Sequence, residues 1–131
     1  MGRTIFKVLT REQWAQAETG APVQAPIDAA DGYVHFSTRR QVQATLSKWF
    51  HGIEGCVLAA FDADDFEPDL KWEKARGGDL FPHVHGEVYA SQMKSLWLLE
   101  MGEDGAPVAP DEVVRRRDDP PRSGGTPDTI S

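Results

Sequence analysis

The chain has one cysteine, Cys56, among its 131 residues. A lone cysteine excludes an intrachain disulfide, and it equally excludes a zinc site built from several cysteines. No hydrophobic run approaches the roughly 20 residues that cross a membrane. The first residues have no signal-peptide core, because Lys7 interrupts them at once. We therefore expect a cytoplasmic protein with no membrane partner.

Basic residues are also scarce, since 14 Lys and Arg stand against 21 Asp and Glu and the net charge is -7. Duplex DNA binders need a wide basic surface, so this balance argues against duplex DNA as a partner. The sequence has no G-x-G-x-x-G motif, no Walker A motif and no internal repeat. A small anionic ligand in a local pocket remains compatible with all of these absences.

In other respects the composition of the chain is that of one ordinary globular domain, with 40% hydrophobic and 27% charged residues. It changes near Met101, because five of the nine prolines follow that residue. The change predicts a folded domain over residues 1–101 and a flexible, Pro- and Gly-rich tail over residues 102–131. Within the tail, residues 111–117 place acids before bases, as a short helix prefers.

Hydrophobic spacing predicts six strands and two helices, both helices in the N-terminal half. Thr10 and Gln13 form a capping box that begins the first helix at Arg11. Ser37 or Thr38 caps a second helix over residues 39–50, and residues 20–30 are expected to form a loop. The expected strands are 4–9, 33–37, 56–62, 70–73, 84–90 and 95–100. This order favours an α+β fold with mostly antiparallel strands.

Three segments concentrate the polar side chains. In the strand over residues 33–37, alternation places Tyr33, His35 and Ser37 on one face. In the second segment, Trp72 offers a stacking surface and Glu73 a carboxylate directed at a site. The sequence alone favours the alternative, a half-buried edge strand with Glu73 in solvent.

The third segment covers residues 77–87, where His83, His85 and Glu87 alternate after a pair of glycines. The two histidines form an H-x-H pair to which His35 would add a third metal ligand, and this leaves a metal-dependent hydrolase with Glu73 as one hypothesis. The same residues suit phosphate or ribose hydroxyls. The weak H-x-H pattern leads us to expect no metal.

Taken together, these segments resemble a bacterial family known as domain of unknown function 952. The matching stretches are residues 6–9 with Trp14, 31–38, 70–73 and 76–86, and the resemblance covers residues 4–100. It implies a fold similar to that of ADP-ribosyltransferases, in which two packed antiparallel sheets surround a cleft that holds NAD.

The resemblance also implies roles for the residues. His35 would bond the adenosine ribose, Ser37 and Thr38 would support the nicotinamide side, and a glutamate would stabilise the developing oxocarbenium ion. Glu73 and Glu87 are the alternatives for that glutamate. Tyr33 or Trp72 would stack on a flat ring, and His83 and His85 would add ligand contacts. We expect NAD as the substrate of an enzyme, or else a non-catalytic module that binds a nucleotide or a protein.

Overall fold

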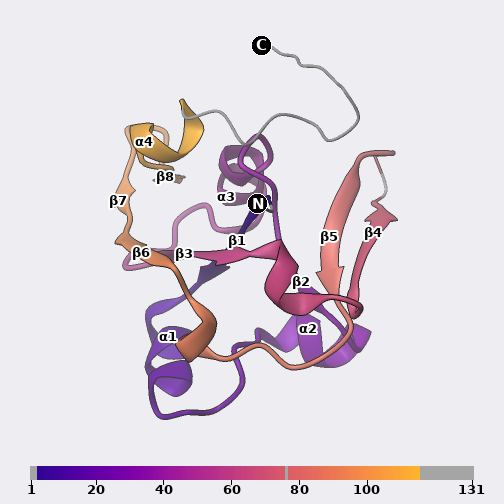
Figure 1. The fold of residues 1–131 in the computed structure, drawn as a ribbon. Coiled ribbons are helices and arrows are strands. Elements are labelled where there is room, and N and C mark those ends of the chain that lie inside the picture. Colours follow the sequence, from indigo (N-terminus) through magenta and orange to yellow (C-terminus); the bar gives the residue numbers. More distant parts are fainter. Residues whose placement is uncertain (1–2, 76, 116–131) are drawn as a thin grey trace.

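Two antiparallel three-stranded sheets form the centre of the fold in the computed structural model, which describes residues 3–75 and 77–115. The first sheet has the order β1-β3-β6, and the second has the order β2-β5-β4. A third, two-stranded sheet pairs β7 with β8. The strands are β1 (Thr4–Leu9), β2 (Val34–His35), β3 (Val57–Asp62), β4 (Leu70–Lys74), β5 (Leu80–Val84), β6 (Ser95–Leu98), β7 (Glu100–Met101) and β8 (Pro107–Val108). Figure 1 shows the second sheet beside the first, with short helices around both, and this arrangement confirms the α+β class.

The helices are short, and the predicted capping box is confirmed in one of them. The hydroxyl of Thr10 accepts from the backbone of Gln13, and the Gln13 side chain accepts from the backbone of Thr10. The helical segments are α1 (Arg11–Glu18), α2 (Pro26–Asp31), α3 (Val42–Trp49), η1 (Ala63–Phe66), η2 (Ala90–Gln92) and α4 (Asp111–Val114). None of the helices in the described part of the chain has the length and apolar character that crossing a membrane requires.

The prediction for the second helix was wrong about its start. Residue 41 is the N-cap of α3 and makes no side-chain cap, so neither Ser37 nor Thr38 caps it. The Ser37 hydroxyl instead lies 2.9 Å from the hydroxyl of Thr45, within the helix.

The loop predicted over residues 20–30 was also wrong, because its second half forms α2. Pro26 occupies the first turn, where a missing N–H costs nothing. The carboxylate of Asp28 accepts from the backbone N–H of Ala25 at 2.7 Å. Gly32 ends the helix with a φ of 85°, a left-handed conformation that glycine adopts without strain. Together these features fix Asp28 in the helix that precedes β2.

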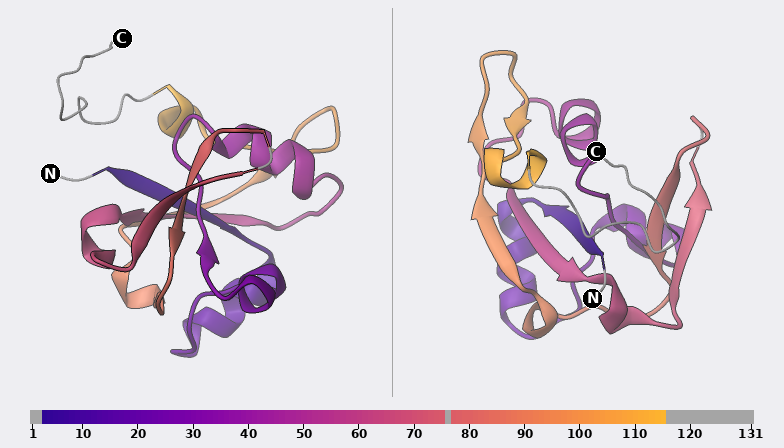
Figure 2. Two further views of the ribbon diagram at one scale, coloured as in Figure 1. Left: turned by 90° about the vertical axis from the view of Figure 1, so that its right-hand side faces the viewer. Right: turned by 45° about the horizontal axis from the view of Figure 1, so that its top comes forward.

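The first sheet is buried on both faces. Along β3, Val57, Ala59 and Phe61 face one core, and Leu58 and Ala60 face the other. The first core is shared with the second sheet through Val34, Leu70 and Val84, and Phe36, directly after β2, joins it. Figure 2 shows β4 and β5 crossing in front of the first sheet, so the two sheets form packed layers. The opposite face of the second sheet carries Lys71, Glu73 and His83.

The domain boundary predicted at Met101 is too early. Ala106, Ala109 and Val113 are buried, and two of them join the core beneath α3. The guanidinium of Arg39 donates to the carbonyl of Val113 at 2.9 Å. These small apolar residues pack well despite the Pro and Gly around them, so the folded unit includes residues 102–115. The rest of the predicted tail, 116–131, lies outside the described residues.

Candidate functional site

Tyr33 lies at the centre of a cluster of three histidine rings. Its ring centroid is 4.4 Å from that of His83, in a stacked arrangement, and 4.7 and 4.8 Å from those of His35 and His85. His35 and His83 are direct partners in the β2–β5 ladder, and their rings are 5.1 Å apart. Cross-strand partners share a face, so the sheet itself brings these rings together. We call Tyr33, His35, His83 and His85 the ring cluster.

His35 is held from beneath by a buried carboxylate. Its Nδ1 donates to Asp28 Oδ1 at 2.7 Å, and its backbone N–H donates to the same oxygen at 3.0 Å. The other oxygen of Asp28 lies 2.8 Å from Lys7 Nζ, which also donates to the carbonyl of His35 at 2.9 Å. The side chains of Lys7 and Asp28 are 5% and 1% exposed. A fully buried ion pair therefore supports one ring of the cluster.

The electrostatics keep Asp28 ionised. Burial alone would raise the pKa of its carboxyl, but the hydrogen bond from His35 and the charge of Lys7 outweigh that effect and hold the pKa at about 2. Burial lowers the pKa of Lys7 from its ordinary value, and the nearby Asp28 opposes that change. Both charges are compensated within hydrogen-bond distance, as burial requires.

The second ring nitrogen of His35, Nε2, lies 3.0 Å from Asp31 Oδ2. Asp31 is the last residue of α2, and its side chain is 39% exposed, whereas Asp28 is sealed from solvent. His35 thus lies between one buried and one exposed carboxylate.

Glu73 on β4 joins the other two histidines. Its Oε1 lies 2.7 Å from His83 Nδ1 and 3.0 Å from His85 Nε2. The hydrogen bonds from His85 and then His83 lower the pKa of Glu73, so an exposed, ionised carboxylate stands beside the ring cluster. Burial lowers the pKa of His83, with Glu73 opposing the change, and the imidazole is therefore mainly neutral at pH 7.

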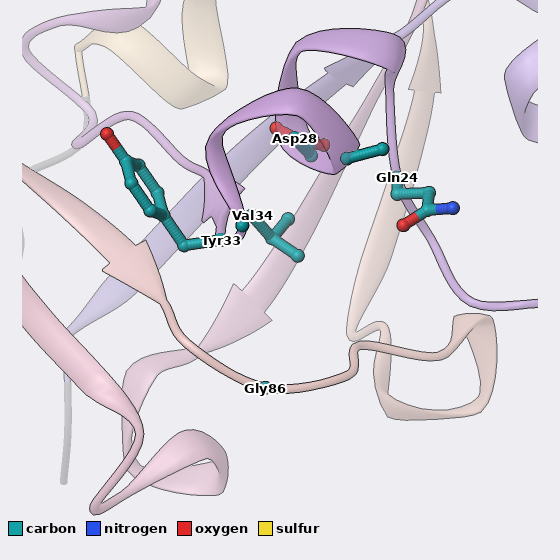
Figure 3. A pocket seen from close by; sticks show the side chains of 7 residues that line it. Gln24, Asp28, Tyr33, Val34 and Gly86 are labelled. Atoms are coloured by element: carbon teal, nitrogen blue, oxygen red, sulfur yellow. The ribbon is translucent and has the colours of Figure 1, made fainter.

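A shallow pocket of about 240 Å³ adjoins the ring cluster and shares Tyr33 with it. Figure 3 shows this pocket between α2 and the chain at Gly86, with the Tyr33 ring extending from one side of it. Its lining consists of Gln24, Asp28, Ala29, Gly32, Tyr33, Val34 and Gly86. Burial, followed by the charges of Asp31 and Glu73, raises the pKa of Tyr33, so its hydroxyl stays protonated near neutral pH. The site therefore offers an aromatic face, imidazoles, carboxylates and a hollow beside them.

Three of the predicted binding residues lie elsewhere. Ser37 and Thr38 are buried near the start of α3, where Ser37 contacts Thr45 and the Thr38 backbone donates to the Gln41 side chain. Trp72 points from the opposite face of β4, packs against the first core and lies under the guanidinium of Arg3 at 4.7 Å. Strand alternation explains why the Trp72 side chain points away from the ring cluster, because its neighbour Glu73 lies on the face of the cluster.

The two glutamates proposed as alternatives have different surroundings. Glu73 contacts two histidines of the ring cluster, whereas Glu87 is exposed and accepts a hydrogen bond from the hydroxyl of Tyr89. Glu73 is thus the carboxylate that the fold brings to the cluster.

The side chains suggested as metal ligands, namely His35, His83, His85 and Glu73, do not converge on a common point. Both nitrogens of His35 face carboxylates, and His83 and His85 both bond to Glu73. Within residues 3–75 and 77–115, no three His, Cys, Asp or Glu side chains are arranged to hold a metal ion.

Three residues of this site, namely Lys7, Asp28 and Asp31, were not predicted from the sequence. The signal for Asp28 was present, because proline followed by aspartate two residues later is typical of a helix start. Lys7 stands among apolar residues of β1, and nothing in that strand indicates which acid it meets.

Comparison with known proteins gives a family and a fold. The model of the family described as "Protein of unknown function (DUF952)" matches residues 8–96. The X-ray structure of protein CC0527 from Caulobacter crescentus is similar to this chain with a TM-score of 0.80 and 36% identity, over 84% of this chain and 97% of that one. Its solution NMR structure has a TM-score of 0.71 and 37% identity, over 79% and 90% of the two chains. No curated protein matches the chain.

Proposed function

The chain belongs to the DUF952 family, and from this premise we propose that its ring cluster binds NAD or another ligand that contains ADP-ribose. One observation carries the proposal. The ionised carboxylate of Glu73, 42% exposed, stands beside an aromatic ring that already stacks against an imidazole. A sugar diol and a flat base need such a combination of acceptor, donor and stacking surface.

Each part of the site would meet a different part of the ligand. The Tyr33 ring would stack on nicotinamide or adenine, with the adjoining pocket receiving one end of the molecule. The imidazoles would bond ribose hydroxyls, because a neutral imidazole whose N–H bonds a carboxylate keeps its other nitrogen as an acceptor. Lys71 stands opposite His83 in the β4–β5 ladder and shares its face, so its ammonium would meet the diphosphate. The likeness to ADP-ribosyltransferases is part of this proposal.

The proposed reaction breaks the bond between nicotinamide and ribose. The bonding electron pair leaves with the nicotinamide nitrogen, and the sugar becomes an oxocarbenium ion. Glu73 stabilises that ion through the ribose 2'-hydroxyl, as a carboxylate does in glycoside hydrolysis. Water or an acceptor hydroxyl then forms the new bond to C1', and its proton passes to solvent.

Two measurements on the full chain test this function. ADP-ribose is expected to raise the melting temperature of the wild type, and NAD is expected to release nicotinamide above the uncatalysed rate. Glu73→Gln should abolish release, and Glu87→Gln is the matched control because it alters an exposed glutamate that accepts a hydrogen bond from Tyr89. Binding without any release would support the non-catalytic module instead. No thermal shift at millimolar ADP-ribose and NAD would refute both forms of the proposal.

A further inference from the structure

Both oxygens of the buried Asp28 carboxylate accept hydrogen bonds from neighbouring residues. Oδ1 accepts two hydrogen bonds from His35, through Nδ1 and the backbone N–H. Oδ2 accepts from Lys7 Nζ and from the backbone of Ala25. Asp28 is therefore fixed by β1 and by the start of α2, and it can present only an acceptor to the His35 ring.

A fixed acceptor decides where a neutral imidazole keeps its proton. Free neutral histidine exchanges its proton between the two nitrogens, and a hydrogen bond at one nitrogen sets the form that is present. An ionised carboxylate donates nothing, so the nitrogen that faces Asp28 must carry the hydrogen. The other nitrogen, Nε2, is then left with its lone pair on the half-exposed side of the ring.

We infer that Lys7 and Asp28 are positioning residues that keep the proton of neutral His35 on Nδ1 and present Nε2 to the ligand. We further infer that Asp31 bonds to Nε2 when the ring is doubly protonated and no ligand is bound. The inference rests on the proposed function for the ligand's identity, but the state of the ring is a property of the free protein.

The contact with Asp31 follows from the same rule. A carboxylate oxygen 3.0 Å from Nε2 needs a hydrogen on that nitrogen, so this contact belongs to the doubly protonated ring. Loss of that proton ends the attraction and exposes Nε2 as an acceptor for a ligand hydroxyl. Asp31 is exposed enough to turn away, which Asp28 is not.

Other charged groups around His35 come from each element packed against it. Lys7 lies on β1, Asp28 and Asp31 on α2, and His83 on β5, while Glu73 reaches the cluster only through His83 and His85. Of these, Asp28 and Asp31 alone contact the ring nitrogens of His35. The two carboxylates can therefore be tested separately.

The first experiment measures the His35 ring by ¹⁵N NMR in the free full chain, with the resonance assigned by its loss in His35→Gln. At a pH where the ring is neutral, we expect the proton on Nδ1. Asp28→Asn should move it toward Nε2, while the signals of His51, which bonds the carbonyl of Asp104, stay unchanged and report an intact fold. A proton on Nε2 in the wild type would overturn the assignment, whether or not Asp28→Asn folds.

The second experiment measures ADP-ribose affinity at about 1 M salt, where the Debye length is about 3 Å and general charge effects are screened. At a pH where the NMR experiment finds the wild-type ring doubly protonated, Asp31→Ala should bind about three- to tenfold more tightly, because the ligand no longer displaces a carboxylate. Glu103→Gln, on the turn between β7 and β8, is the control and should match the wild type. Equal or weaker binding by Asp31→Ala would refute its role. If the wild type binds no ADP-ribose, the proposed function fails, and the NMR result still decides the His35 assignment.

Discussion

Glu73 on β4 accepts a hydrogen bond of 2.7 Å from Nδ1 of His83 on β5, although the two residues are not directly opposed. The ladder pairs Glu73 with Phe81 and Lys71 with His83. Glu73 and His83 are thus diagonal neighbours on one face, a separation that long side chains can span. This diagonal contact and the hydrogen bond from His85 join the Glu73 carboxylate to the ring cluster.

The hydrogen bonds from His83 and His85 should be measurable through the pKa of the Glu73 carboxylate. Glu73 has a lowered pKa because His85 and His83 bond to its ionised form. Replacing both by alanine should therefore raise that pKa toward its ordinary value of about 4.3. Titration of the Glu73 side-chain carbon by ¹³C NMR measures the change, with His51→Ala as the control. An unchanged titration in the double variant would mean that the two bonds are absent in solution.

Removing one partner of the buried Lys7–Asp28 ion pair should lower the free energy of unfolding. Lys7→Met leaves the buried charge of Asp28 without its cation, and we expect a loss of about 3–5 kcal/mol in the free energy of unfolding. Combining it with Asp28→Leu should recover part of that loss, because no buried charge then remains. Urea unfolding of both variants measures the difference. A single variant as stable as the wild type would contradict the buried pairing.

Acid should remove the contribution of the Asp28 carboxylate to the free energy of unfolding. Its folded pKa of about 2 is below the unfolded value of about 3.9, so its stabilisation is complete above about pH 5 and declines as the pH falls toward 2. The wild type and Asp28→Asn should therefore differ by about 2–3 kcal/mol at neutral pH from this shift and converge as the pH falls toward 2. Denaturant unfolding across that range measures the gap. A gap that stays constant from pH 5 to pH 2 would argue against the lowered pKa.

Two neighbouring valines test the extended domain boundary. Val113 is fully buried, whereas Val114 is 42% exposed. Val113→Ala should cost about 2 kcal/mol through lost burial and the cavity left behind, and Val114→Ala should cost much less. Thermal unfolding of the two variants compares them directly. Equal effects would mean that α4 does not pack on the core.

Local signals in the sequence predicted part of this structure. Alternation along residues 33–37 correctly placed Tyr33 and His35 on one face, and the capping box located α1. Alternation alone failed at Ser37, because the strand ends at His35 and the chain then turns toward β1, where Ser37 pairs with Phe6.

The rest depended on contacts between distant segments. Lys7 meets Asp28 across the fold, and no periodicity in β1 names its partner. The choice between Glu73 and Glu87 depended on the register of β4 against β5, which spacing along one strand does not fix. Burial of Ala106 and Ala109 was hidden by the Pro and Gly around them, because composition reports average behaviour and not the packing of single small side chains.

Calorimetric titration of ADP-ribose into the wild type and Tyr33→Leu shows whether the ring cluster binds this ligand. We expect saturable one-to-one binding by the wild type and at least about tenfold weaker binding by Tyr33→Leu, since stacking on the ring is lost. Trp49→Leu, which alters an exposed aromatic residue on α3, should bind like the wild type. No heat of binding at millimolar ADP-ribose, or equal affinity in Tyr33→Leu, would contradict the assignment of the ring cluster as the ligand site.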